Sequence, residues 1–371
     1  MSLEDQETRV PIASPAVGER ERERVTAVLD SGQLADGDEV RAFEREFATA
    51  CDADHGVATA NGTTALHAAL RACGIGEGDT VVTTPFSFVA TANAVRFCGA
   101  DPVFADIDPE TYNLDPAAVR ATIEARGGDV DAILPVHLYG RPAEMDAFAA
   151  LAAEYDAALV EDAAQAHGAR YREQPVGSLG DAAAFSFYPT KNMTTGEGGM
   201  VVTDDETVAD RAARFVNHGR DDDYEHVELG HNFRMTNLAA AIGRVQLEKL
   251  PAFTEARRSV AASLNGAFDG GDGYPKPPVE ADGARHVYHQ YTVRSRDREA
   301  LAAHLADAGV ETGVYYPTPI HREPAYADVE RSLPRAERAA DEVLSLPVHP
   351  GLSESDRRTI ADAIQTYALT A

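Results

Sequence analysis

Lys191 is one of only three lysines in a chain of 371 residues that otherwise carries arginine as its basic side chain. It lies in the segment Phe185-Ser-Phe-Tyr-Pro-Thr-Lys-Asn-Met-Thr-Thr-Gly-Glu-Gly-Gly199, whereas Lys249 and Lys276 have ordinary helical and proline-rich surroundings. A lysine amine forms a Schiff base with an aldehyde, which arginine cannot do. An amine in a glycine-rich turn suits pyridoxal phosphate (PLP) chemistry. Most lysines are solvated surface residues, so this segment alone leaves both interpretations open.

A carboxylate follows a second apolar strand pattern. Asp162, in Val160-Glu-Asp-Ala-Ala-Gln-Ala-His-Gly168, is expected at the carboxyl end of that strand, where open α/β sheets bind ligands. A carboxylate there can keep a pyridine nitrogen protonated and so make the ring an electron sink. Gln165 can hydrogen-bond a ring hydroxyl. The alternative is a loop in which Asp162 only caps the next helix.

Two further segments offer groups that bind a phosphate. Asn61-Gly-Thr-Thr-Ala-Leu-His-Ala-Ala-Leu70 has the pattern of a turn entering a helix, with Thr63 and Thr64 in the first turn. Free N–H groups and hydroxyls at such a helix start form an anion site. Ser186 ends another strand pattern, five residues before Lys191. The alternatives are an ordinary threonine-capped helix and a buried serine that bonds to backbone.

These residues need a scaffold that brings strand ends together. Residues 1–60 are predicted to be mostly helical, with amphipathic stretches at Glu19–Leu29 and Gly37–Ala50. From Asn61 onward, short apolar strands alternate with helices such as Asp115–Ala125, which indicates an α/β fold with a mostly parallel sheet covered by helices. The predicted strands are Thr80–Thr84, Pro102–Ala105, Ala132–Val136, Ala158–Val160, Ala183–Phe187 and Met200–Thr203.

The C-terminal part of the chain changes character. Met235–Phe268 is a long helical pattern, interrupted at Pro251, that could lead out of the large domain. The sequence predicts an N-terminal segment and large PLP-binding α/β domain over residues 1–251, and a small α+β domain over residues 252–371. The expected elements of the small domain are the turn-rich Gly270–Pro278, a strand at His289–Val293, a helix at Asp297–Gly309, extended Val310–Tyr316, and a helix at Ser353–Ala368 with a Ser353/Asp356 capping box.

The composition of the chain limits the classes of binding partner and the cellular compartment that are expected for the protein. The net charge of −28 argues against nucleic-acid and anionic-membrane partners, which need a basic surface. No run approaches the roughly 20 apolar residues of a membrane span, and no secretory signal is visible, so a cytoplasmic protein is expected. Cys51, Cys73 and Cys98 lack metal-ligand spacing, so no metal site is expected. Scarce lysine with abundant acidic residues suggests a halophilic cytoplasm.

Together these motifs resemble the DegT/DnrJ/EryC1/StrS family of PLP-dependent nucleotide-sugar aminotransferases. The similarity runs from about residue 10 to the end of the chain. It implies the PLP-dependent transferase fold of the aspartate-aminotransferase class (type I) and a homodimer with shared active sites. Further matching segments are Pro85-Phe-Ser-Phe-Val-Ala-Thr-Ala-Asn93, Leu134-Pro-Val-His-Leu-Tyr-Gly140, Gly230-His-Asn-Phe-Arg-Met-Thr-Asn237, Tyr315-Tyr-Pro-Thr-Pro-Ile-His321 and Ser345-Leu-Pro-Val-His-Pro350.

The resemblance implies a role for each matching position. Lys191 is expected to be the catalytic residue that holds PLP as a Schiff base, and Asp162 to pair with the ring nitrogen. The other expected cofactor contacts are Gln165 to the ring hydroxyl, Thr63, Thr64 and Ser186 to the phosphate, Phe88 stacked on the ring, and Asn232 from the partner subunit. Candidate contacts to the sugar and diphosphate are Tyr188, Arg234, Tyr315, Tyr316 and His321.

The implied reaction moves an amino group from an amino acid, with glutamate expected, to a nucleotide-linked keto-deoxy sugar in amino-sugar and surface polysaccharide or glycan biosynthesis. A 4-keto acceptor is favoured over a 3-keto one because Gly230–Thr236 resembles C4-aminating members. Three alternatives stay open: a sugar dehydratase of the same family, a PLP enzyme acting on amino acids, and a non-catalytic PLP-fold regulatory protein. Dehydratases of the family carry His in place of the lysine, so Lys191 argues against the first.

Overall fold

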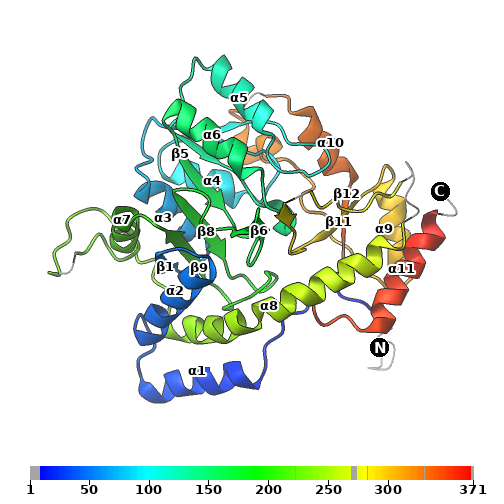
Figure 1. The fold of residues 1–371 in the computed structure, drawn as a ribbon, viewed down its shortest axis with the longest axis horizontal. Helices are drawn as coiled ribbons and strands as arrows, with labels where there is room; N and C mark the ends of the chain where they lie inside the picture. The colour runs from blue at the N-terminus through cyan, green and yellow to red at the C-terminus, as the bar shows by residue number, and fades with distance from the viewer. Residues whose placement is uncertain (1–8, 222, 269–273, 282, 330, 369–371) are drawn as a thin grey trace.

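The central sheet of the computed structural model has seven strands in the order β1-β9-β8-β5-β4-β2-β3 (Figure 1). The structure describes residues 9–221, 223–268, 274–281, 283–329 and 331–368. β9 pairs antiparallel with both of its neighbours, and the remaining pairs are parallel. The predicted α/β fold with a mostly parallel sheet is confirmed. The strands are β1 (His55–Thr59), β2 (Thr80–Thr83), β3 (Asp101–Phe104), β4 (Ala132–Leu134), β5 (Ala158–Asp162), β8 (Ala182–Ser186) and β9 (Gly199–Thr203).

Helices cover both faces of this sheet. Because successive strand residues point to opposite faces, Val201 belongs to a core beneath α3, α4 and α7, while Val202 belongs to a core beneath α2 and α8. α5 and α6 extend the cover on the second face. These helices are α2 (Asp38–Ala50), α3 (Gly62–Ala72), α4 (Ala90–Phe97), α5 (Pro116–Ala125), α6 (Met145–Tyr155), α7 (Glu206–Val216) and α8 (Asn237–Asn265).

A second core lies beyond the sheet, where α8 passes from one core to the other. Leu250 packs in the core of the large sheet, and Val260 and Leu264 pack in the second core. This core also contains the two-stranded sheet β11-β12. Its elements are β11 (Tyr291–Arg294), α9 (Arg298–Asp307), β12 (Val343–Leu346) and α11 (Glu354–Ala368), while α10 (Pro334–Glu342) instead packs with residues near Phe104 and Tyr139.

Smaller elements complete the described chain. A three-stranded sheet has the order β10-β6-β7, with β6 (Arg170–Tyr171), β7 (Gln174–Pro175) and β10 (Ala284–Arg285). The 3-10 helices are η1 (Leu138–Gly140), η2 (Ile320–Arg322) and η3 (Pro324–Tyr326). None of the described helices is long and apolar enough to cross a membrane. The predicted turn-rich stretch at 270–278 lies partly outside the described residues.

Two expectations about local structure were wrong. The described part of the segment predicted to be mostly helical, residues 9–60, also contains a strand, because His55–Thr59 forms β1 at the edge of the central sheet. Gly56 allows this strand to approach α2, since a Cβ atom there would lie 2.6 Å from the Glu44 carbonyl oxygen. Pro251 does not interrupt α8, which runs unbroken from Asn237 to Asn265. A proline removes one helix hydrogen bond, and burial of Leu250 and Thr254 on either side offsets that loss.

Val310–Tyr316, expected to be extended, makes isolated bridges at Val310 and Gly313 rather than a strand ladder. The other predicted helices and strands form within a few residues of the expected bounds. Asp115 caps α5 by accepting a hydrogen bond from Ala117 N. The capping box of α11 is also present, because Asp356 accepts from Ser353 N and donates its own N–H to Ser353 Oγ.

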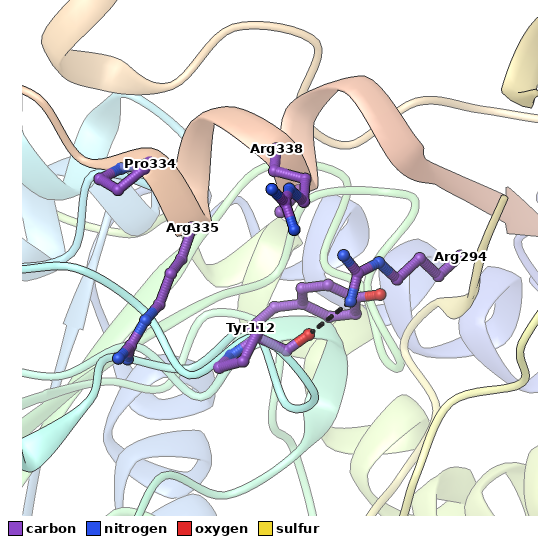
Figure 2. Close-up of a pocket in the computed structure, with 7 residues that line it drawn as sticks. Tyr112, Arg294, Pro334, Arg335 and Arg338 are labelled. Carbon is purple, nitrogen blue, oxygen red and sulfur yellow. Dashed lines mark hydrogen bonds between the residues drawn. The ribbon is translucent and has the colours of Figure 1, made fainter. Parts of the chain in front are cut away.

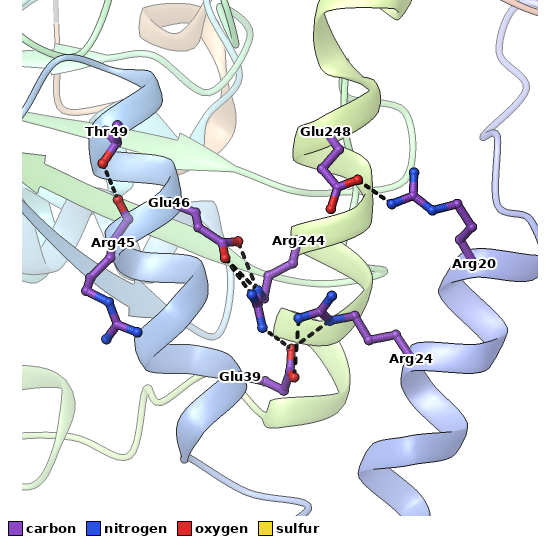
Figure 3. A network of polar contacts seen from close by, with 8 residues as sticks. All are labelled: Arg20, Arg24, Glu39, Arg45, Glu46, Thr49, Arg244 and Glu248. Carbon is purple, nitrogen blue, oxygen red and sulfur yellow. Dashed lines mark hydrogen bonds and ion pairs between the residues drawn. The ribbon is translucent and has the colours of Figure 1, made fainter.

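A network of ion pairs holds α1 (Glu19–Ser31) and α2 against α8 (Figure 3). Arg244 of α8 contacts Glu39 at 3.0 Å and Glu46 at 2.9 Å, both on α2. Arg24 of α1 donates to the same Glu39 carboxylate at 2.9 Å. A single glutamate therefore links all three helices. In a strongly acidic chain, this arrangement uses arginine to neutralise carboxylates where helices meet.

Candidate active site

A cavity of about 670 Å³ opens where β1, β2, β5 and β8 end. Because parallel strands present their carboxyl ends at one edge of a sheet, turns that are far apart in sequence meet there. The structure brings most of the predicted site residues to this cavity. Those that line it are Thr63, Thr64, Phe88, Asp162, Gln165, Ser186, Tyr188, Lys191, Tyr315 and Tyr316.

Lys191 lies in the turn after β8, partly buried in the cavity wall. Its backbone N–H donates to Tyr188 O at 2.9 Å, which fixes the turn. Burial lowers the pKa of the amine to about 8, and the nearby Asp162 carboxylate opposes that shift. With this pKa, about a tenth of the amine is neutral at pH 7, several hundred times more than for an ordinary lysine. The amine is therefore suited to attack an aldehyde.

Asp162 ends β5 as a buried carboxylate. Its Oδ2 accepts a 2.7 Å hydrogen bond from the Thr91 hydroxyl, which lies 2.9 Å from that of Ser87. Its Oδ1 accepts from Ala164 N at 3.2 Å. Burial raises the pKa of Asp162, while the bonds from Thr91 and Ala164 lower it. The Ala164 bond closes a local turn. The alternative that Asp162 caps the next helix is wrong, because β5 is followed by β6 and not by a helix, and Asp162 lines the cavity.

The start of α3 forms one wall of the cavity. Asn61 caps the helix by accepting from Thr64 N at 3.0 Å, and the Thr64 hydroxyl donates to Asn61 O. Both the amide and the hydroxyl of Thr64 are thus engaged in the cap. Within the described chain, the N–H groups of Gly62 and Thr63 have no hydrogen-bond acceptor. Gly62 also lets Ser186 lie close, since a Cβ atom there would be 2.5 Å from Ser186 Cβ.

Aromatic and amide groups complete the cavity. Gln165 accepts from Tyr139 N at 2.7 Å and donates to the Tyr316 hydroxyl at 3.1 Å, so its amide has a fixed orientation. Phe88 is 55% exposed, and its ring centroid lies 6.1 Å from that of Tyr316. An exposed phenylalanine face inside a cavity is available for stacking against a planar ring.

These observations test whether the cavity suits PLP. The cofactor has an aldehyde, a pyridine nitrogen, a phosphate and a flat aromatic ring. The cavity offers the Lys191 amine, the buried Asp162 carboxylate, the free N–H groups at the start of α3, and the Phe88 face. Each feature of the cofactor therefore has a group of matching chemistry, and the residues fit it.

Three predicted residues lie away from the cavity of their own chain. Asn232 is exposed and pairs through its backbone with Asn217. Arg234 donates to the Asn217 side chain at 2.6 Å. His321 is buried, with its Nε2 3.0 Å from a Glu337 carboxylate oxygen, so its imidazole packs between η2 and α10. For His321, burial in this polar contact leaves no surface for a sugar within the same chain.

The sequence analysis missed several residues that line the cavity. Thr91 and Ser87 lie within the matched segment Pro85–Asn93, but nothing in their types marked them as partners of Asp162. His289 and Gln290 come from the segment before β11, which reaches the cavity only through the fold. Burial lowers the pKa of His289 well below the ordinary value, so this imidazole is neutral.

Comparison with known proteins agrees with this geometry. Residues 15–365 match the DegT/DnrJ/EryC1/StrS aminotransferase family. A Geobacillus stearothermophilus protein named "Pleiotropic regulatory protein" is 43% identical over 345 residues, 92% of either chain. The "dTDP-3-amino-3,4,6-trideoxy-alpha-D-glucose transaminase" of Streptomyces venezuelae is 42% identical over 348 residues, 93% of this chain and 91% of that protein.

A solved structure extends the agreement to three dimensions. The crystal structure of S. venezuelae DesV in complex with ketimine intermediate superposes with a TM-score of 0.90, at 41% identity over 94% of each chain. The match therefore covers the sheet, the second core and the cavity between them. The chain belongs to the DegT/DnrJ/EryC1/StrS aminotransferase family, and it is a PLP-dependent aminotransferase.

Proposed function

We propose that this enzyme transfers an amino group from glutamate to a nucleotide-linked keto-deoxy sugar, with a 4-keto acceptor preferred over a 3-keto one, in amino-sugar and surface polysaccharide or glycan biosynthesis. The observation that carries the proposal is the placement of Lys191 and Asp162 in one cavity whose mouth is lined by tyrosines. The Streptomyces relative supports a nucleotide-sugar substrate by its name, which describes a 3-amino sugar. The Gly230–Thr236 motif supports the 4-keto preference.

The residues of the cavity divide by the chemistry that each can offer the cofactor. Asp162 would hold the proton on the ring nitrogen, and Gln165 would bond the ring hydroxyl. The free N–H groups of Gly62 and Thr63, with the Ser186 hydroxyl, would hold the phosphate. Phe88 would stack on the ring. When bound, the cofactor supplies an aldehyde for amines and a ring that absorbs negative charge.

Lys191 carries the proton chemistry in this proposal. About a tenth of its amine is uncharged at pH 7 because burial lowers its pKa to about 8. Once free of the cofactor, the amine removes the proton from the α-carbon of the donor as a general base, and returns a proton as a general acid. A pKa near the working pH suits both directions. The Asp162 carboxyl group, held by the Thr91 hydroxyl, lines the same cavity.

Acceptor recognition is assigned to the tyrosines at the cavity. Tyr188 is 49% exposed, and Tyr315 and Tyr316 are partly buried beside it. Their hydroxyl groups are suited to bond the hydroxyls of a sugar, and their rings are suited to pack on its apolar faces. Arg234 lies outside the cavity of its own chain, so its proposed contact with the diphosphate requires the partner subunit. His321 is not included, because it is buried against Glu337.

We also propose a homodimer whose subunits share their sites. Asn232 is exposed and lies away from its own cavity, so it would serve the partner's site. The segment before it carries exposed apolar side chains, and Leu229 is 96% exposed. This segment extends away from the body of the chain beside α7 (Figure 1). Such apolar exposure favours a surface that a partner covers.

The division of the chain at residues 251 and 252 belongs to the same proposal. The second core, built on β11, β12, α9 and α11, supports a small C-terminal domain. α10 returns to pack on the large domain, near Phe104 and Tyr139. The cytoplasmic and halophilic setting stays a proposal that rests on the acidic composition.

A non-catalytic role is the second candidate, because one relative is named a pleiotropic regulatory protein. Lys191 and Asp162 are both present and share the cavity, which favours catalysis. The two functions make different demands on Lys191. A regulatory role that uses only cofactor binding would survive without turnover, whereas an aminotransferase would not.

A panel of nucleotide-linked 4-keto and 3-keto sugars, assayed with glutamate and PLP from low to high salt, tests the proposal. Expected results are release of 2-oxoglutarate with a 4-keto acceptor and a new amine at C4. Lys191→Ala should abolish turnover, and Lys249→Ala serves as the matched control because Lys249 pairs with Glu21 and does not line the cavity. No 2-oxoglutarate release with any acceptor, from protein that binds PLP, would contradict transamination. An amine at C3 would correct the position only.

A further inference from the structure

A second pocket, of about 310 Å³, lies outside the active-site cavity and is lined by three arginines (Figure 2). Arg294 comes from the end of β11, while Arg335 and Arg338 come from α10. Because Arg335 and Arg338 are three residues apart, they share one face of the helix. The remaining wall includes the ring of Tyr112 and the side chain of Pro109. Arg294 and Arg338 thus direct guanidinium groups from two separate parts of the fold toward one concavity, while Arg335 turns its guanidinium aside to Asp115 (Figure 2).

Neighbouring carboxylates fix two of these arginines but do not neutralise the pocket. Arg294 pairs with Glu342, and Arg335 donates to Asp115 at 2.6 Å. Arg338 has no hydrogen bond or ion pair to any described residue. Of the three arginines, only Arg338 is therefore without a carboxylate partner among the described residues.

Two more cations lie beside the pocket. Arg296, two residues beyond Arg294, stacks over the Tyr274 ring at 4.5 Å, and Lys276 lies 5.5 Å from the same ring centroid. Lys276 pairs through its backbone with Arg294. Neither side chain has an acidic partner among the described residues. The chain has a net charge of −28, so a local excess of positive charge is unexpected on a surface that has no function.

We propose that this pocket binds a small molecule bearing a diphosphate group. Guanidinium groups are suited to phosphate oxygens because they donate paired hydrogen bonds in a fixed plane. The start of α10 offers few free N–H donors to an anion, because Asp106 already accepts from the N–H groups of Arg335 and Ala336. The side chains must therefore hold the anion. The Tyr112 and Pro109 surfaces favour an occupant that has a sugar or base attached to its phosphates.

The pocket is distinct from the active site. The Tyr112 ring lies between them and packs edge-on against Tyr139, with centroids 6.1 Å apart. Tyr139 in turn donates its backbone N–H to Gln165, which lines the active-site cavity. An occupant would bridge β11 of the second core and α10, which packs on the large sheet. The proposal does not depend on which sugar the enzyme aminates.

Titration calorimetry on the PLP-loaded enzyme tests the site, because bound PLP blocks the phosphate cup at α3. Inorganic pyrophosphate, UDP and uridine are the three probes. Pyrophosphate and UDP should each bind saturably, and uridine should not. Arg338→Glu should weaken pyrophosphate binding by at least about tenfold, the range expected for lost hydrogen bonds to a charged group. Arg338→Lys should retain part of the affinity.

Arg358→Glu is the matched control, because Arg358 is an exposed arginine of α11 with a 75% exposed side chain and the same change in charge. It should change pyrophosphate affinity by less than about twofold. Circular dichroism of all three variants confirms that the fold is intact. Absence of saturable pyrophosphate binding, or an equal loss in Arg338→Glu and Arg358→Glu, would overturn the proposal. UDP binding that is tighter than pyrophosphate binding and that Arg338→Glu weakens would support a nucleoside diphosphate as occupant of this pocket; equal affinities would support the diphosphate group alone.

Discussion

The Thr91 hydroxyl donates a 2.7 Å hydrogen bond to Oδ2 of Asp162 inside the wall of the active-site cavity. Thr91 is 1% exposed, and its hydroxyl is in turn 2.9 Å from that of Ser87. Thr91 lies in α4 and Asp162 at the end of β5, so the bond ties a helix to the strand that presents the carboxylate. Its effect on the carboxylate is to lower a pKa that burial raises. Thr91 is therefore a positioning residue for Asp162.

Thr91→Val should weaken Asp162 as the proposed acidic partner of the cofactor while keeping the side-chain shape of residue 91. Without the hydroxyl, the pKa of Asp162 rises further, and less of its negative charge is available to hold a proton on the ring nitrogen. Turnover should fall about tenfold, the size expected for a lost hydrogen bond to a charged group. The visible absorption band of the bound cofactor, followed against pH, should shift its midpoint. Thr91→Ser should restore both properties; if Val and Ser variants behave alike, Thr91 acts only in packing.

The rate at which the Lys191 amine reacts with PLP should depend on pH, with a midpoint set by the pKa of the buried amine. Burial lowers its pKa to about 8, so Schiff-base formation by the apoenzyme should accelerate as pH rises through about 8 and then level off. Asp162→Asn removes the charge that opposes this shift, so the midpoint should move below the wild-type value. Stopped-flow absorbance measures the rates, and borohydride trapping with peptide mapping identifies the lysine.

The controls for this prediction use the other lysines. Lys249 and Lys276 should not be trapped, and Lys249→Arg should leave the midpoint unchanged. A midpoint near that of an ordinary lysine, or a rise in Asp162→Asn, would mean that the amine is not in the buried environment described. Asp162→Asn should also lower turnover by orders of magnitude while retaining the cofactor much better than it retains activity.

Local patterns predicted most of the fold because each acts over a few residues. Asp115 caps α5, and the Ser353/Asp356 box starts α11, as side-chain chemistry at helix starts requires. β1 was missed because its five residues, which include a glycine, do not show the alternation of apolar and polar residues that is typical of a strand. Its stability comes instead from pairing with β9 and from the approach that Gly56 allows to α2. Tertiary contacts of this kind are not visible in a local window.

The same limit applies to the site. Lys191 and Asp162 could be predicted from sequence, because lysine is rare in this chain and Asp162 follows a recognisable strand pattern. Thr91 could not, since a threonine in a helix is common and only the meeting of α4 with β5 gives it a partner. His321 misled for the converse reason. Its type is suited to substrate binding, but the fold buries it against Glu337.

Arg244→Met should destabilise the fold in a salt-dependent manner. Arg244 contacts both Glu39 and Glu46, so its loss leaves two carboxylates of α2 without their shared partner. The free energy of unfolding should fall by about 1 kcal/mol in low salt, near the upper end for single exposed ion pairs because this side chain is only 20% exposed. Urea unfolding at several salt concentrations measures the change.

The difference between wild type and Arg244→Met should shrink in 1 M salt, where screening acts over about 3 Å. Arg358→Met is the matched control, since Arg358 pairs with Glu354 within α11 and both side chains are highly exposed. It should change the unfolding free energy by less than about 0.5 kcal/mol. An equal loss in the two variants would show that the network around Glu39 adds nothing beyond a single surface pair.

Activity should require a dimer in which Asn232 of one subunit completes the site of the other. Asn232 is exposed and does not line its own cavity, which holds Lys191. Lys191→Ala chains lack the amine, and Asn232→Asp chains carry a carboxylate that should repel the cofactor phosphate. Mixing the two inactive chains pairs each intact Lys191 with the intact Asn232 of the other subunit. About one working site per mixed dimer should appear, because a two-fold interface places the same surface of both chains in contact.

Subunit exchange is verified with differently tagged chains, and activity is compared with each parent alone. If mixed dimers form and no activity returns, Asn232 acts within its own chain or the interface lies elsewhere.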